Sequence, residues 1–108
     1  MPLFPKEDRL RKTGDFVRAR KTGRRVSTEA ILISHIKGLC QRFGVVVGSN
    51  VGNAVKRNRI KRVFRDFFRL NRELFPVGDC VVVAKPQADK LTNNELRKCL
   101  VALLKKIT

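Results

Sequence analysis

The sequence predicts an α+β sandwich, in which helices pack on one small sheet. A long amphipathic helix is expected from Asn53 to about Leu74, between two short apolar runs typical of buried strands, and a second amphipathic segment occupies the last sixteen or so positions. At 108 residues the chain can bury one hydrophobic core. We therefore expect a single domain over residues 1–108.

The N-terminal half is expected to contain an arm, a helix and strands. Residues 1–8 carry two prolines among small and charged residues, which favours an extended arm. A short helix is predicted over 13–23, with a threonine N-cap and a glycine stop. Residues 26–36, rich in β-branched side chains, are predicted as strand ending at the Lys-Gly pair 37–38, and residues 42–48 as the next strand.

The long helix has Asn53 as its expected N-cap, and the Pro-Val-Gly sequence at 76–78 ends it. Helical periodicity predicts one apolar face from Ile60, Val63, Phe64, Phe67, Leu70 and Leu74. The opposite side gathers cations and one amide: Asn58, Lys61, Arg62, Arg65, Arg69 and Arg72. Asp66 is the only acid before Glu73, so this side repels itself unless an external polyanion neutralises it.

The C-terminal part is expected to add one strand and one helix. Residues 80–84 read as a short buried strand closed by Pro86. Thr92 and Glu95 have the spacing of a capping box, so the last helix is expected to begin there. Its predicted core stripe is Leu96, Leu100, Leu103, Leu104 and Ile107.

The charge balance indicates a nucleic-acid partner. The 25 Lys and Arg residues against nine Asp and Glu give a net charge of +16. No apolar run approaches the ~20 residues of a membrane span, and the N-terminus lacks the pattern of a secretory signal, so neither membrane binding nor export is expected. Cys40, Cys80 and Cys99 are odd in number and widely spaced, which predicts small buried side chains in a reducing cytoplasm.

Catalytic and metal-binding groups are not evident. Metal-dependent cleavage of a phosphodiester needs clustered carboxylates, and the acids here are scattered. His35 is the only histidine and is expected to be structural or to contact RNA; Ser27 and Ser49 have no evident base partner. The glycine-containing segment 48–52 lacks a Walker pattern, so a nucleotide site is disfavoured. We expect no catalytic residue, no metal ligand and no small-molecule substrate.

The segment from Gly52 to Arg62 resembles the signature motif of the bacterial ribonuclease P protein subunit, Gly-x-Ala-Val-x-Arg-Asn-x-x-Lys-Arg, and the segment from Leu10 to Phe16 is also similar to that family. The resemblance implies the order helix, strands, long helix, strand, helix (αβββαβα). It further implies a left-handed βαβ crossover, although physics favours the right-handed form.

The resemblance also implies the activity. The protein would bind a catalytic RNA and the 5′ leader of precursor tRNA, and would assist the RNA in removing that leader. The RNA would carry the active site and its Mg²⁺ ions, and the protein itself would bind no cofactor.

Two groups of RNA-contacting residues are implied by the resemblance. The catalytic RNA would contact Lys56, Arg57, Asn58, Arg59, Lys61, Arg62, Arg65 and Arg69. The leader would lie in a cleft between the first helix and the sheet, against Phe16, Arg20, Ser34, Arg11 and Lys12.

The sequence departs from the family pattern at four of its positions. Arg20 and Ser34 stand where the family often has aromatic residues, so we expect leader contact to depend more on charge than on stacking. Ser49 and Asn50 stand where lysines are common in the family, which weakens the expectation of a phosphate contact at these positions. Composition alone would equally suit a ribosomal or ribosome-assembly protein, whereas a protein-only ribonuclease would have to cleave without RNA.

Overall fold

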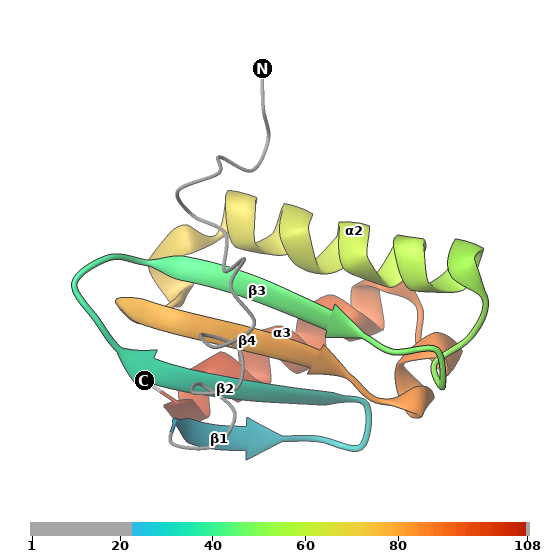
Figure 1. Cartoon of the computed structure of the whole chain (residues 1–108), viewed down its shortest axis with the longest axis horizontal. Coiled ribbons are helices and arrows are strands. Elements are labelled where there is room, and N and C mark those ends of the chain that lie inside the picture. The colour runs from blue at the N-terminus through green and yellow to red at the C-terminus, as the bar shows by residue number, and fades with distance from the viewer. Residues whose placement is uncertain (1–22, 108) are drawn as a thin grey trace.

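The computed structural model describes residues 23–107, which form a four-stranded sheet with two α-helices (Figure 1). The predicted arm and first helix lie outside the described residues, and so do four of the residues predicted to bind the leader: Arg11, Lys12, Phe16 and Arg20.

The sheet is mixed and has the strand order β1-β2-β4-β3. Its strands are β1 (Arg24–Ser27), β2 (Ile31–Lys37), β3 (Arg42–Val47) and β4 (Gly78–Ala84). β2 pairs antiparallel with β1 and with β4, whereas β3 and β4 are parallel neighbours. The strands predicted over 42–48 and 80–84 are confirmed.

The single strand predicted over 26–36 is wrong, because a tight turn divides it into β1 and β2. The Thr28 backbone N–H donates to the carbonyl of Ile31 (2.8 Å), and the Thr28 hydroxyl accepts from the N–H groups of Ala30 and Ile31. A threonine side chain that satisfies backbone groups in this way supports a turn without glycine or proline. The usual sequence signals of a turn were therefore missing.

The helices α2 (Ala54–Leu70) and α3 (Asn93–Ile107) cover the same face of the sheet, which is the rear face in Figure 1. The chain passes from β3 through α2 on that face to its parallel neighbour β4. Seen with the helices toward the viewer and the strands pointing up, β4 lies to the left of β3, so the crossover is left-handed. The fold order and handedness implied by the family resemblance are thus confirmed for the described residues.

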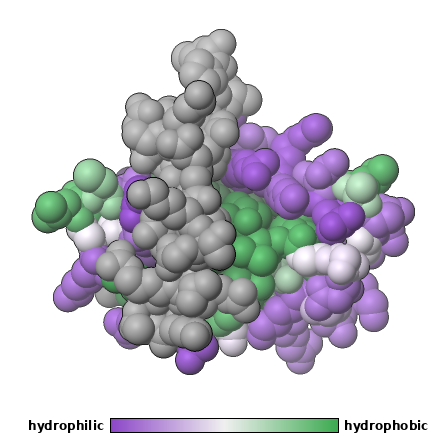
Figure 2. Space-filling model, viewed as in Figure 1, coloured by the Kyte–Doolittle hydropathy of each residue, from purple (hydrophilic) through white to green (hydrophobic). Residues whose placement is uncertain are grey.

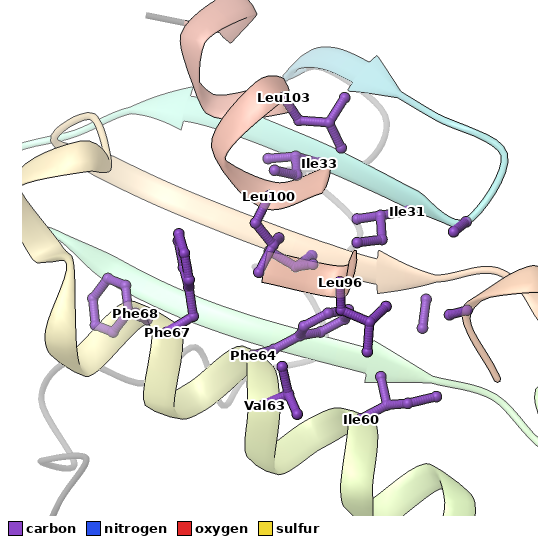
Figure 3. Close-up of a cluster of buried hydrophobic side chains, with 14 of the residues drawn as sticks. Ile31, Ile33, Ile60, Val63, Phe64, Phe67, Phe68, Leu96, Leu100 and Leu103 are labelled. Atoms are coloured by element: carbon purple, nitrogen blue, oxygen red, sulfur yellow. The ribbon is translucent and has the colours of Figure 1, made fainter. Parts of the chain in front are cut away.

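The core lies between the sheet and the two helices (Figure 3). Ile31 and Ile33 of β2 point toward Leu100 and Leu103 of α3, and Phe64 of α2 fills the space beside them. All five leucine and isoleucine positions predicted for the α3 stripe are buried. Burial of these side chains, at about 1.5–3 kcal/mol each, is the main force that holds α2 and α3 on the sheet.

The apolar face of α2 differs from the prediction at its C-terminal end. Leu70 is 64% exposed and Leu74 is 38% exposed, whereas Phe68, which the periodicity did not select, is buried. α2 ends at Leu70 because Asn71 leaves helical geometry and its side-chain amide donates to the carbonyl of Phe67 (3.0 Å). A short 3₁₀ helix, η2 (Arg72–Leu74), follows.

The sequence predicts Arg72 on the basic side of the long helix, but in the structure it lies beyond the end of α2, in η2. Its Nε donates to Oε1 of Gln41 (3.3 Å), and its guanidinium lies 5.1 Å from the centre of the Phe68 ring. This ring belongs to a buried aromatic cluster, in which it stacks on Phe43 at 4.6 Å and meets Phe75 edge-on at 4.9 Å.

Gly78 starts β4 where two segments of backbone approach closely. Its φ of 124° is the only positive φ among the described residues. A Cβ at this position would collide with the carbonyl oxygen of Ile36 and would lie 2.8 Å from the backbone nitrogen of Gly38. The neighbouring carbonyl of Val77 accepts a hydrogen bond from Nε2 of His35 (2.9 Å), so the only histidine has the structural role that was one of its two predicted roles.

The three cysteines occupy three different environments and none forms a disulfide. Cys80 is buried in β4, which raises the pKa of its thiol to about 12. Cys99 is half-buried, and Cys40 is exposed in the loop between β2 and β3. The prediction of a buried side chain is therefore wrong for Cys40, because this loop projects beyond the helix-covered part of the sheet.

Candidate nucleic-acid interface

The start of α2 is set by a tight turn and a side-chain cap. The Val51 N–H donates to the carbonyl of Gly48 (3.1 Å), which closes the turn after β3, and the Val51 side chain is buried. Oδ1 of Asn53 accepts from the backbone N–H of Lys56 (3.0 Å), which confirms Asn53 as the N-cap. The first turn of α2 contains no acidic residue, so its positive end is left for an external anion.

Six of the eight residues predicted to contact the catalytic RNA form one outward side of α2. We call this set the basic face; its members are Arg57, Asn58, Lys61, Arg62, Arg65 and Arg69. Asn58, Arg62 and Arg65 are exposed, and the other three are half-buried. The only acid on α2 is Asp66, whose Oδ1 lies 4.0 Å from Nη2 of Arg69.

Two side chains of the basic face each hold a buried nitrogen for which residues 23–107 provide no hydrogen-bond acceptor. Nε of Arg57 and Nε of Arg69 are both buried without a hydrogen-bond partner in the described part of the chain. A buried donor without an acceptor costs free energy, about 1–3 kcal/mol for an uncharged group and more for a charged one. An acceptor from outside the protein would remove that cost.

The remaining two predicted residues, Lys56 and Arg59, point to the other flank of α2. Nη1 of Arg59 donates to Oδ1 of Asn93 (2.6 Å), and Nη2 donates to the carbonyl of Leu91 (3.3 Å). Nζ of Lys56 lies 3.1 Å from Oδ2 of Asp89, in the 3₁₀ helix η3 (Pro86–Lys90). These two cations thus join α2 to the segment that leads into α3.

The face of the sheet opposite the helices carries a second candidate surface. Val81 is buried there with the partly buried Ile36, Val46 and Val83 packed against it. Figure 2, which looks onto this face, shows a hydrophobic patch over the sheet with hydrophilic residues above it along α2. Such an apolar surface beside cations suits unstacked bases next to phosphates.

Ser34 lies on this same sheet face, as the leader prediction requires, because it alternates with Ile33 and His35 on the helix-facing side. However, Ser34 is fully buried, and its hydroxyl has no hydrogen-bond partner among residues 23–107. Direct contact with an RNA strand would need the hydroxyl to become accessible, so its role in leader binding stays a prediction.

An ion pair that the sequence did not predict lies on the sheet face opposite the helices. The guanidinium of Arg42 in β3 donates to both carboxylate oxygens of Asp79 in β4, at 2.8 and 2.7 Å. The two residues are adjacent in the parallel register but 37 positions apart in the chain, so only the strand pairing could have revealed them.

The chemistry of the described residues is that of binding. Among residues 23–107 no group of three or more His, Cys, Asp or Glu side chains is placed to hold a metal ion. Nor does any helix of this region have the length and apolarity to cross a membrane. What the region does present is an α-helix with cations along its outward side and an apolar sheet face beside it.

Comparison with known proteins identifies the family. A family model described as Ribonuclease P matches residues 4–108. The chain belongs to the ribonuclease P protein family. It is 39% identical over 107 residues to the ribonuclease P protein component of Desulforapulum autotrophicum, with 96% of this chain and 92% of the relative covered. It is 39% identical over 104 residues to that of Syntrophobacter fumaroxidans, with 93% and 87% covered.

Solved ribonuclease P proteins share the fold. The Staphylococcus aureus protein superposes with a TM-score of 0.86 at 29% identity, covering 92% of this chain and 94% of that one. The Thermotoga maritima protein superposes with a TM-score of 0.82 at 32% identity, covering 93% and 97%. The family predicted from the segment 52–62 is confirmed, and the protein is a component of the ribonuclease P ribonucleoprotein together with its RNA subunit.

Proposed function

We propose that this protein is the subunit of ribonuclease P that holds the RNA subunit through the basic face of α2 and the 5′ leader of precursor tRNA on the sheet face opposite α2 and α3. The tRNA 5′ processing role follows from the family. The observation that carries the proposal is the one-sided charge of α2, with five cations and one amide on its outward side. Helix cations in this arrangement neutralise phosphates and release counterions.

In this proposal the polypeptide supplies positioning, and the RNA subunit supplies the catalytic site with its Mg²⁺ ions. The protein needs no cofactor of its own, because bond cleavage is assigned to the RNA. The three unpaired cysteines support action in a reducing compartment, which we take to be the cytoplasm.

The basic face can be tested with matched double variants. Lys61→Ala with Arg65→Ala removes two cations from the basic face, and Lys105→Ala with Lys106→Ala removes two exposed cations from the far end of α3. Both variants lower the net charge by the same amount. We expect the α2 variant alone to reduce the salt-dependence slope of RNA-subunit binding, by about 2 for two lost phosphate contacts. If both double variants reduced this slope equally, RNA binding would depend on the net charge of the protein and not on the basic face.

The leader site can be tested by comparing holoenzyme affinity for the same tRNA with and without a leader of several nucleotides. We expect tighter binding of the leader-bearing RNA. Phe16→Ala should remove about 1–3 kcal/mol of that preference if one base stacks on the ring. Phe16→Leu controls for lost apolar volume, and equal wild-type affinities for both RNAs would overturn the leader assignment.

A ribosomal or ribosome-assembly role is the alternative that composition left open. The family match favours ribonuclease P. RNA that copurifies with the protein discriminates between them: we expect one noncoding RNA of several hundred nucleotides, whereas ribosomal RNA alone would favour the alternative.

A further inference from the structure

A groove between α2 and the start of α3 forms a second concentration of cations. Its volume is about 410 Å³, and its polar lining comes from Asn58, Arg59 and Arg62 of α2 with Asn93 and Arg97 of α3. Three guanidinium groups thus converge there against one carboxylate, Asp66. Asn93 and Arg97 lie outside the segment 52–62, whose motif predicts RNA binding.

The guanidinium groups of the groove differ in how they are held. Arg59 is fixed, because Nη1 donates to Oδ1 of Asn93 (2.6 Å) and Nη2 donates to the carbonyl of Leu91 (3.3 Å). Arg97 donates from Nη1 to Oδ1 of Asn94 (2.8 Å), which leaves its other N–H groups for a ligand. Arg62 makes no hydrogen bond or ion pair within residues 23–107.

The chemistry of this lining fits a phosphodiester. Guanidinium groups present planar pairs of N–H donors that match the oxygens of a phosphate group. The volume lies within the ~300–1,000 Å³ typical of ligand sites. The groove is only partly enclosed, which suits a passing strand better than a small anion bound by itself. Asp66 does not cancel this charge, since its carboxylate also lies beside Arg69 of the basic face.

The occupant follows from continuity with the basic face. Asn58 and Arg62 belong both to the groove and to the basic face, so a strand bound along α2 reaches the groove without leaving the protein surface. We propose that this groove binds a backbone phosphate of the RNA subunit, that Arg97 contacts it directly, and that Asn93 positions Arg59 for the same contact. This inference rests on the proposed function of the basic face.

The test compares Arg97→Ala with Lys98→Ala. The two residues are adjacent and exposed on α3, and each variant removes one positive charge, but Lys98 does not line the groove. Binding of the purified RNA subunit is measured over a range of salt concentrations. We expect Arg97→Ala to lower affinity and to reduce the magnitude of the log-log slope by about 0.7–0.9, the range for one phosphate contact, while Lys98→Ala leaves the slope unchanged. Arg97→Lys, which keeps the charge, should restore most of the slope.

The possible results separate the groove site from the proposed function of the basic face. Thermal melts of Arg97→Ala should match the wild type, since the one hydrogen bond that Arg97 makes within residues 23–107 is to Asn94 on the same helix. Equal slopes for Arg97→Ala and Lys98→Ala would overturn the groove site. If the double variant of Lys61 and Arg65 still reduces binding in that case, the proposed function stands and only the groove fails. A loss that appears only in precursor-tRNA affinity of the saturated holoenzyme would overturn the choice of the RNA subunit as occupant.

For the positioning role of Asn93, the informative variants are Asn93→Asp and Asn93→Ala. Asn93→Asp keeps an oxygen that accepts from Arg59, whereas Asn93→Ala removes it. We expect Asn93→Ala to lower RNA affinity severalfold with little change in slope, because the charge of Arg59 remains but its orientation is lost. If Asn93→Ala binds like the wild type, Arg59 does not depend on it.

Discussion

Arg57 and Arg59 belong to the same motif but have different contacts in the structure. Both flank the apolar side of α2, and the sequence predicts the same role for both. In the structure Arg57 lies on the basic face, and its buried Nε has no acceptor in the part of the chain that is described, whereas Arg59 donates hydrogen bonds to Asn93 and Leu91. The partners of Arg59 are 32 and 34 positions away in the chain, so periodicity along one helix could not reveal them.

This difference predicts that the two variants differ in stability, although both should weaken binding to the RNA subunit. Arg59→Ala should lower the free energy of unfolding by about 1–2 kcal/mol, because it removes hydrogen bonds made by a charged group. Arg57→Ala should not lower it, because this variant removes a buried donor that has no acceptor within residues 23–107, yet it should weaken assembly with the RNA subunit. Urea unfolding of both variants measures the first effect, and RNA titration measures the second. Indistinguishable unfolding curves would show that the bridge from α2 to α3 contributes nothing to the fold.

At the scale of single elements, the sequence predicts the helices better than their ends. The capping box of α3 is confirmed: Thr92 N–H donates to Oε1 of Glu95 (2.9 Å), and Glu95 N–H donates to the Thr92 hydroxyl (3.2 Å). A cap is a local device, so four residues suffice to predict it. The end of α2 instead depends on Asn71 and on the aromatic cluster. In this cluster the ring of Phe68 packs against Phe43 of β3 and against Phe75, which follows η2.

The corrected apolar face of α2 gives a matched pair of variants. Phe68→Ala should lower the free energy of unfolding by about 3–5 kcal/mol, since it opens a cavity between Phe43 and Phe75. Leu70→Ala should change it by less than about 0.5 kcal/mol, because that side chain is 64% exposed. Chemical denaturation of both proteins measures the two values. A large loss in Leu70→Ala would restore the face predicted from periodicity.

The capping box also predicts a pH dependence. The hydrogen bonds from the Thr92 backbone and side chain lower the pKa of Glu95 below its ordinary value. A lowered folded-state pKa means that the carboxylate stabilises the fold above its ordinary pKa and that this contribution disappears as the pH falls through the lowered value. Wild type should therefore exceed Glu95→Gln in Tm at neutral pH, and the gap should close in acid. A gap that is constant with pH would exclude the ionised carboxylate as its cause.

At the scale of the whole molecule, the left-handed crossover is the feature that physics alone would have predicted wrongly. A right-handed connection is the rule for parallel strands, and no residue between β3 and β4 signals the exception. Only the resemblance to the ribonuclease P protein family predicted the left-handed crossover. With α2 and α3 together on one face, neither of these helices covers the other sheet face, and hydrophilic residues along α2 border the hydrophobic patch on that face (Figure 2).

The net charge of +16 leads to a prediction for the complete assembly. Each phosphate that the protein neutralises releases condensed counterions, so binding must weaken as salt rises. Four to six contacts along the basic face give an expected log-log slope of roughly −3 to −5 for binding to the RNA subunit. Filter binding from low to moderate salt measures this slope, with the Lys61 and Arg65 double variant as the internal reference. A slope near zero would mean that shape or base contacts hold the complex, and that the one-sided charge of α2 serves some purpose other than neutralising RNA.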